Sequence, residues 1–169
     1  MLRRYNTIKY NDVANAPGIS VSIYLQGCPH HCKGCFNPET WDYNGGQELT
    51  EDLLENLFQN KINKNGIKRS LCILGGEPLC EENIATTYTL ASMAKSYGVN
   101  VYIWTGYVFE ELEKTDLLFE IFENTDYLID GPFIEEEKDI TLKMRGSRNQ
   151  RVIDIKKYLK KEKNYVIIV

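Results

Sequence analysis

Three cysteines with the spacing of metal ligands lie in the first quarter of the chain. Cys28, Cys32 and Cys35 fall within eight residues of the segment GCPHHCKGCFNPETW, and their spacing is Cys-x3-Cys-x2-Cys. Cysteine thiolates hold iron–sulfur clusters, and three of them on one loop can bind three irons of a four-iron cluster. The fourth iron would keep an open position, which a metal needs in order to act on a substrate. The spacing therefore predicts that these three cysteines are metal ligands.

The same spacing also fits a zinc ion. His30 or His31 could complete a tetrahedral site with the three cysteines. Structural zinc sites usually draw a second ligand pair from elsewhere in the chain, but Cys72 and Cys80 stand alone and are more typical of small core residues. Spacing alone leaves the iron–sulfur cluster and a zinc-stapled interaction domain both open.

A second segment that could do chemistry is Gly75–Pro78 (GGEP), which follows the apolar run Leu71–Leu74. Such a segment can be a plain turn, because glycine accepts a positive φ and proline ends a strand. Glycine also lets the backbone approach a ligand closely, since it has no side chain. Thr105-Gly106 and Asp130–Pro132 follow later strand-like runs in the same way. We expect Trp104 to be buried, while Thr105 could face a ligand.

The elements that must position these segments alternate along the chain. Apolar runs and alternating patterns predict strands at 19–25, 71–74, 99–104, 127–129 and 165–169. Apolar stripes predict helices at 51–58 with Thr50 as the N-cap, at 81–97 ending at Gly98, and at 108–123.

Strands that alternate with helices indicate βα units and a parallel sheet. The repeats are too few for a closed eight-fold barrel, so an open, partial barrel or a doubly wound sheet remains. We predict an α/β fold, a partial (open) parallel βα barrel, as a single domain over residues 1–169. Ligands should then bind at the carboxyl ends of the strands, where the cysteine and glycine segments lie.

Composition narrows the function classes. The 169 residues are 43% hydrophobic and 26% charged, which is ordinary for a globular protein. The net charge of -4 argues against a nucleic-acid partner. The N-terminus MLRRYNTIKY lacks the apolar segment of a signal peptide, and no stretch approaches the roughly 20 apolar residues of a membrane helix. We therefore expect a cytoplasmic protein with no membrane partner, in which clustered cysteines bind metal more often than they form disulfides.

The motifs, taken in order, resemble a known family. A Cys-x3-Cys-x2-Cys loop after the first strand, with GGEP after the second, is similar to the radical S-adenosylmethionine superfamily. More narrowly, GCPHHCKGCFNPETW, GGEPL, WTGY, DYLIDGPF and RGSRNQRVID resemble the activating proteins of anaerobic ribonucleoside-triphosphate reductases. The matches run from Asn15 to about Asp154, which is nearly the whole chain.

Two positions depart from wider patterns. Glycyl-radical activases often carry Asp-Gly-Pro-Gly-x-Arg before the first strand, whereas Asn15–Ser20 has no arginine. Many superfamily members place an aromatic residue before the third cysteine, where this chain has Gly34, and the glycine resembles the reductase-activating branch.

The resemblance implies two cofactors and a set of residues that hold them. It implies a 4Fe-4S cluster on the three cysteines of the loop and S-adenosyl-L-methionine at the open iron. The implied cofactor-binding residues are Gly34, Phe36, Gly75, Gly76 and Glu77. The glycine segment would bind the methionine amino group, Glu77 would add a carboxylate facing that amine, and Phe36 would stack on the adenine or serve as a core aromatic. The resemblance assigns no proton-transfer role to His30 or His31, which would be loop residues beside the cluster.

The implied activity is that of a radical oxidoreductase. An external electron donor such as a flavodoxin would reduce the cluster, and S-adenosylmethionine would be cleaved reductively. The resulting 5′-deoxyadenosyl radical would take a hydrogen from a glycine of the partner reductase under anaerobic conditions. Activation of another glycyl-radical enzyme, such as pyruvate formate-lyase, is the alternative. The basic stretch 143–151 would be a solvated loop, a docking surface or a contact to the cofactor carboxylate.

Overall fold

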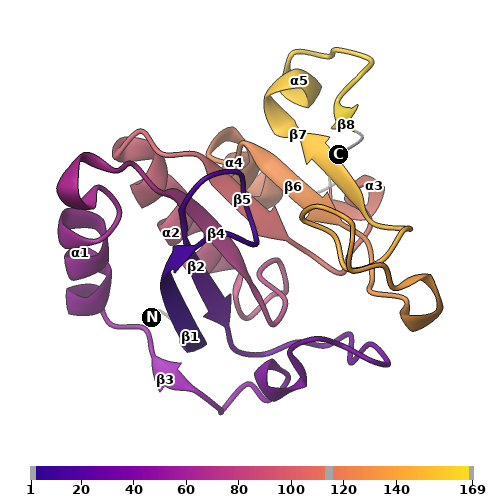
Figure 1. The fold of residues 1–169 in the computed structure, drawn as a ribbon, viewed down its shortest axis with the longest axis horizontal. Helices are drawn as coiled ribbons and strands as arrows, with labels where there is room; N and C mark the ends of the chain where they lie inside the picture. Colours follow the sequence, from indigo (N-terminus) through magenta and orange to yellow (C-terminus); the bar gives the residue numbers. More distant parts are fainter. Residues whose placement is uncertain (1–2, 113–115, 168–169) are drawn as a thin grey trace.

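The computed structural model describes residues 3–112 and 116–167, and Figure 1 shows their arrangement. The strands are β1 (Arg4–Asp12), β2 (Ser20–Leu25), β3 (Gln47–Glu48), β4 (Ser70–Gly75), β5 (Val101–Trp104), β6 (Tyr127–Asp130), β7 (Arg151–Asp154) and β8 (Val166–Ile167). The α-helices are α1 (Glu51–Asn60), α2 (Ile84–Ser96), α3 (Phe109–Leu112), α4 (Asp116–Glu123) and α5 (Ile155–Leu159). Within the described ranges the strands form one eight-stranded sheet in the order β3-β1-β2-β4-β5-β6-β7-β8. The α/β class is confirmed.

The sheet is parallel in its centre and antiparallel at both sides. β2, β4, β5 and β6 pair in parallel, as the alternation of strands and helices predicts. β1 and β3 on one side, and β7 and β8 on the other, pair antiparallel. The predicted partial barrel of parallel strands is therefore not confirmed, because the structure is an open, mixed sheet. Residues 4–12 and 151–154 alternate too weakly in hydropathy to predict the flanking strands.

Helix α1 forms where local capping and an apolar stripe agree. The Thr50 side chain accepts a hydrogen bond from the Leu53 N–H at 3.2 Å, which satisfies one of the free donors at the helix start. Leu54, Leu57 and Phe58 are buried on one face of the helix. The predicted cap and helix are confirmed.

Other boundaries differ in detail. The helix predicted over 81–97 begins later, at Ile84, and ends before Gly98, whose φ is +65°. The region 108–123 contains two helices, α3 and α4, and residues 113–115 of that prediction lie outside the described residues. The final strand covers Val166–Ile167, and residues 168–169 also lie outside.

The two faces of the sheet differ in what covers them. One face packs against the helices in the larger core, to which β2 contributes Val21, Ile23 and Leu25. The opposite face forms a smaller cluster around Tyr24, Leu74, Tyr102 and other residues. Strand β2 is buried along its whole length, because both faces of the sheet are covered at this strand. None of the helices in the described part of the chain is long and apolar enough to span a membrane.

Candidate functional site

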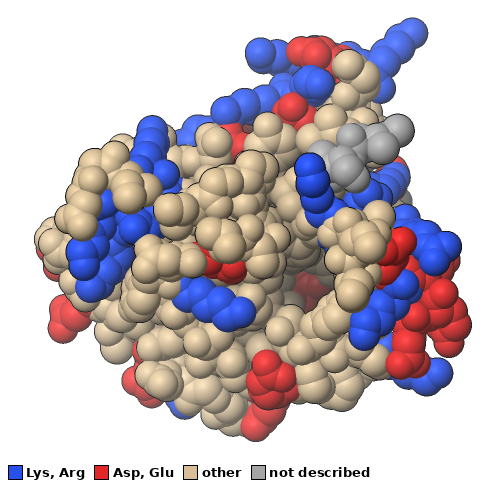
Figure 2. Space-filling view, viewed as in Figure 1, with Lys and Arg blue, Asp and Glu red and all other residues tan. Residues whose placement is uncertain are grey.

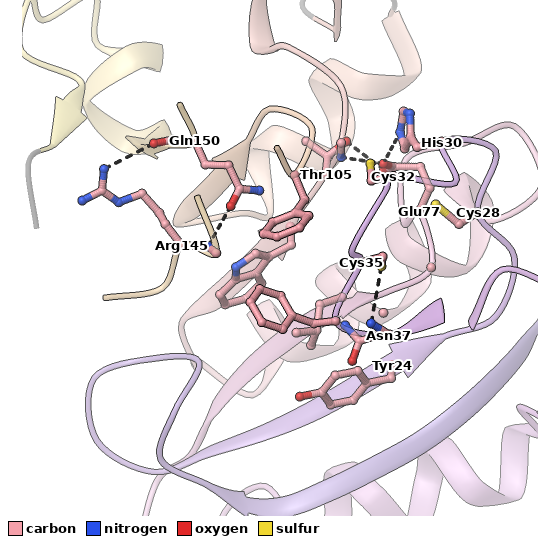
Figure 3. A pocket seen from close by; sticks show the side chains of 18 of the residues that line it. Tyr24, Cys28, His30, Cys32, Cys35, Asn37, Glu77, Thr105, Arg145 and Gln150 are labelled. Atoms are coloured by element: carbon pink, nitrogen blue, oxygen red, sulfur yellow. Dashed lines mark hydrogen bonds and ion pairs between the residues drawn. The ribbon is translucent and has the colours of Figure 1, made fainter. Parts of the chain in front are cut away.

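A cavity of about 410 Å³ lies at the carboxyl ends of the parallel strands. The space-filling view shows this face hollowed, and Figure 3 shows the side chains that line it (Figures 2 and 3). Its wall combines the cysteine loop (residues 27–41), the glycine turn (residues 75–78) and a C-terminal loop (residues 131–150). The volume lies in the range of small-molecule sites. The cavity therefore lies at the carboxyl ends of the strands, where the sequence predicts that ligands bind.

All three predicted metal ligands line this cavity. Cys28 is buried, whereas Cys32 and Cys35 are partly exposed, and none forms a disulfide. Burial raises the pKa of the Cys28 thiol to about 11. The Cys28 N–H donates to the Trp41 carbonyl at 3.2 Å, which joins the two ends of the loop, and the Gly27 carbonyl accepts a hydrogen bond from the Glu77 N–H at 2.8 Å, which anchors the loop to the glycine turn. Three thiols on one anchored loop at the cavity wall fit a cluster with three cysteine ligands.

The two remaining cysteines lie elsewhere. Cys72 is fully buried in the cluster that contains Tyr102, and Cys80 is buried with its Sγ atom 4.0 Å from the Tyr43 hydroxyl. Their predicted role as core residues is confirmed. Within residues 3–112 and 116–167, no three His, Cys, Asp or Glu side chains are gathered closely enough to hold a single metal ion. A four-iron cluster differs in this respect, because each thiolate binds a separate iron.

The glycine turn is packed tightly against the start of the cysteine loop. Gly75 has a φ of +104°, in the left-handed region that favours glycine. A Cβ at Gly76 would collide with the Gly27 carbonyl oxygen, which accepts a hydrogen bond from the Glu77 N–H at 2.8 Å. Besides any contact with a ligand, these glycines allow the glycine turn to pack directly against the backbone of the cysteine loop. The sequence does not reveal this role.

Glu77 is held in the cavity wall by four contacts from the chain itself. Its side chain is 1% exposed. Oε1 accepts hydrogen bonds from the Leu79 N–H at 2.9 Å and the Thr105 hydroxyl at 2.8 Å. Oε2 lies 2.7 Å from the Gly106 N and 2.8 Å from Nε2 of His30. Figure 3 shows His30 and Thr105 joined to this carboxylate. The sequence did not predict this contact of His30, and the position of His30 between two cysteines was the available signal.

Phe36 lies at the mouth of the cavity. Half of its side chain is exposed, so the interpretation as a core aromatic is wrong. Its ring centroid is 5.0 Å from that of Phe133, and Lys138 Nζ lies 4.8 Å from the Phe36 centroid. Gly34 has a φ of +71° and faces Glu135, since a Cβ there would lie 2.7 Å from a carboxylate oxygen. The cysteine loop thus rests on the C-terminal loop.

The C-terminal loop closes the other side of the cavity. Trp104 is half-buried and lines the cavity, in contrast to the predicted full burial, and its Nε1–H donates to the Met144 carbonyl at 2.7 Å. Arg145, from the basic stretch, also lines the cavity and donates to the Gln150 carbonyl at 3.3 Å. Arg151 belongs to β7 and pairs with a buried carboxylate, so the stretch 143–151 is not a solvated loop throughout.

Comparison with known proteins gives consistent matches over nearly the whole chain. Residues 14–153 match the family described as a 4Fe-4S single cluster domain, which contradicts the zinc alternative. An anaerobic ribonucleoside-triphosphate reductase-activating protein of Escherichia coli (strain K12) is 35% identical over 144 residues, which cover 83% of this chain and 92% of that protein. The protein of the same name from Enterobacteria phage T4 is 34% identical over 152 residues, covering 88% and 92%. The chain therefore belongs to the family of anaerobic ribonucleoside-triphosphate reductase-activating proteins, which use a 4Fe-4S cluster.

Proposed function

We propose that this chain activates an anaerobic ribonucleoside-triphosphate reductase by generating a glycyl radical in it. The observation that carries the proposal is the common cavity: the cysteine loop and the glycine turn, 40 residues apart in sequence between Cys35 and Gly75, line one hollow at the strand ends. The family membership supplies the reaction class. Activation of pyruvate formate-lyase remains an outcome of the test below.

Within this proposal, Cys28, Cys32 and Cys35 hold the 4Fe-4S cluster. The bond between Cys28 and Trp41 closes the loop that carries them, and the bond between Gly27 and Glu77 anchors it to the glycine turn at the cavity wall. When bound, the cluster would pass one electron from the external donor to S-adenosylmethionine, and this reductive cleavage would supply the radical chemistry that removes a hydrogen atom from a glycine α-carbon. The chain provides binding and orientation for this chemistry.

We assign the cofactor contacts to residues of the cavity wall. The backbone of Gly75 and Gly76 would meet the methionine amino group, and the Glu77 carboxylate would add negative charge beside that cationic amine. Phe36 would stack on the adenine with its exposed face. Gly34 would shape the loop so that Phe36 reaches the cavity mouth. Each assignment is supported by position. Phe36, Gly75, Gly76 and Glu77 line the cavity, and Gly34 lies two residues before Phe36 in the loop.

Arg145 is the cation we assign to the cofactor carboxylate. It lies in the cavity wall on the C-terminal loop, across from the cysteine loop. A guanidinium matches a carboxylate well because its donors form a planar fork.

The wider setting follows from the same proposal. We infer that residues 1–169 act as a single domain in the cytoplasm, with an external electron donor such as a flavodoxin. We also infer that the sheet encloses the cofactor as an incomplete barrel, whose open side admits a loop of the reductase. Hydrogen transfer requires the target glycine within roughly 3–3.5 Å of the radical carbon, so that loop must enter the cavity.

The test is direct formation of the radical. The anaerobically reconstituted chain, reduced in the presence of S-adenosylmethionine, should give a doublet in the electron paramagnetic resonance spectrum of an anaerobic ribonucleotide reductase. The doublet should collapse when the glycines of the reductase are deuterated at the α-carbon, and Cys32→Ala should give no signal. A radical that forms on pyruvate formate-lyase and not on the reductase would show that the partner is wrong while the reaction class is right.

A further inference from the structure

His30 lies between two proposed cluster ligands and contacts a residue from a distant part of the chain. Its Nε2 atom is 2.8 Å from Oε2 of Glu77, which lies 47 residues later. The ring also packs edge-on against Tyr107, with centroids 4.6 Å apart. The side chain is 19% exposed. His30 therefore connects the cysteine loop both to the glycine turn and to the segment that follows β5.

The space for the imidazole ring is provided by a glycine. A Cβ at Gly106 would lie 2.5 Å from Cδ2 of His30, so a side chain at this position would displace the ring. The Gly106 N–H donates to the same Glu77 oxygen that His30 contacts. The ring is thus seated between Gly106 and Tyr107, and it points at the carboxylate.

The contacts of Glu77 show what His30 contributes. Three of the four groups around its carboxylate come from the glycine-turn side and from the end of β5: the Leu79 N–H, the Thr105 hydroxyl and the Gly106 N–H. His30 alone among these four belongs to the cysteine loop. All four groups approach acceptor oxygens, so the imidazole donates from Nε2. A buried carboxylate needs such donors, because burial without hydrogen bonds is costly.

We propose that His30 is a positioning residue whose hydrogen bond to Glu77 sets the location of the cysteine loop relative to the glycine turn. The inference rests on the proposed function, because it fixes where the cluster lies relative to S-adenosylmethionine. Two other attachments of the loop do not involve His30. The Gly27 carbonyl accepts the Glu77 N–H, and Lys33 Nζ lies 2.9 Å from a Glu135 carboxylate oxygen. The cluster should therefore still assemble without His30. Its position relative to the glycine turn would, however, be held less firmly.

Two substitutions separate the hydrogen bond from the ring. His30→Phe keeps a ring against Tyr107 but has no donor, whereas His30→Gln keeps an amide donor near the position of Nε2 and has no ring. The measurements on the full, anaerobically reconstituted chain are iron content, affinity for S-adenosylmethionine by calorimetry, and the spectrum of the reduced cluster with and without S-adenosylmethionine. We expect wild-type iron content in both variants. Affinity should fall at least about tenfold in His30→Phe, with a weaker spectral response, and His30→Gln should recover most of both.

The adjacent histidine is the matched control. His31 stacks on Trp41 at 4.8 Å, away from Glu77, so His31→Phe should leave affinity and spectrum unchanged. Gly106→Ala should reproduce the defect of His30→Phe, because its Cβ would lie 2.5 Å from Cδ2 of His30 and would displace the imidazole.

Unchanged affinity and spectrum in His30→Phe would overturn the inference, as would loss of the cluster itself in that variant, since His30 would then act in assembly. A failure of the wild-type chain to bind S-adenosylmethionine would instead overturn the proposed function. The two failures are therefore distinguishable within one set of measurements.

Discussion

At the scale of single residues, the cysteine thiols lie in two kinds of surroundings. Cys32 and Cys35 are partly exposed at the cavity, whereas Cys72 is fully buried in the sheet. Burial disfavours the charged thiolate and raises the pKa of Cys72 to about 12. Because the thiolate is the reactive form, Cys72 should be inert at neutral pH.

This difference predicts the order in which the thiols of the cofactor-free chain react with iodoacetamide. At pH 8 a thiol whose pKa has risen from 9.0 to about 12 has roughly a thousandfold lower thiolate fraction. Cys32 and Cys35 should therefore be modified first and Cys72 last, as followed by mass spectrometry of peptides. In urea all five thiols should react at similar rates. Modification of Cys72 as fast as Cys35 in the folded chain would contradict the buried position.

At the scale of elements, a charged group ties β6, β7 and α3 together. Asp130 at the end of β6 is 1% exposed, and it accepts hydrogen bonds from Arg151 in β7 and from the Phe109 N–H. Arg151 also binds Glu110 with two hydrogen bonds, of 2.9 and 2.8 Å. The hydrogen bond from Arg151 lowers the pKa of Glu110. Asp130, in the segment predicted from the sequence to be a turn, thus holds the antiparallel strand β7 and helix α3 to β6.

Removal of the cation should destabilise the fold. Arg151→Met would leave the Asp130 carboxylate buried without its charged partner, and we expect the free energy of unfolding to fall by about 2–3 kcal/mol. This is somewhat less than for a fully buried pair, because Arg151 is partly exposed. Glu110→Gln, which changes the half-exposed partner, should cost less than about 1 kcal/mol. Urea denaturation of the two variants measures both values. Equal losses would show that the buried carboxylate is not the source of the effect.

At the scale of the whole molecule, the helices protect one face of the sheet and loops form the site on the other. The larger core joins the sheet to α1, α2 and α4 (Figure 1). The cavity is walled by the cysteine loop and the C-terminal loop. Loops with few buried apolar contacts open more readily than core strands. The two loops meet through Phe36 and Phe133, and through Lys33 and Glu135.

Cofactor binding should therefore change hydrogen exchange in a restricted pattern. Addition of the cluster and S-adenosylmethionine should slow exchange at least about tenfold in residues 27–41 and 131–150. Amides of β2, β4 and α2 should already exchange slowly and should change little. Mass spectrometry of the full chain with and without the cofactors measures this pattern. Uniform protection of all segments would mean that the cofactors stabilise the whole fold and not the two loops.

The sequence by itself determined the central fold and the family, and it predicted which residues hold the cofactors. Cys28, Cys32 and Cys35 could be predicted as cluster ligands because ligand type and spacing are local properties, and because the motif order resembled one family. The parallel core was predictable because strongly apolar strands such as β4 alternate with helices that have their own capping signals. These signals lie within a few residues of one another, so they do not depend on the final fold.

The tertiary structure decided what depends on long-range contact. The flanking strands β1 and β7 take their places by pairing with β2 and β6. Neither the mostly polar sequence of β1 nor the four residues of β7 reveal this pairing. The contact between His30 and Glu77, and the need for glycine at position 76 beside Gly27, arise where two loops cross. Such contacts depend on the positions of residues far apart in the chain, which are fixed by the packing of the sheet between them.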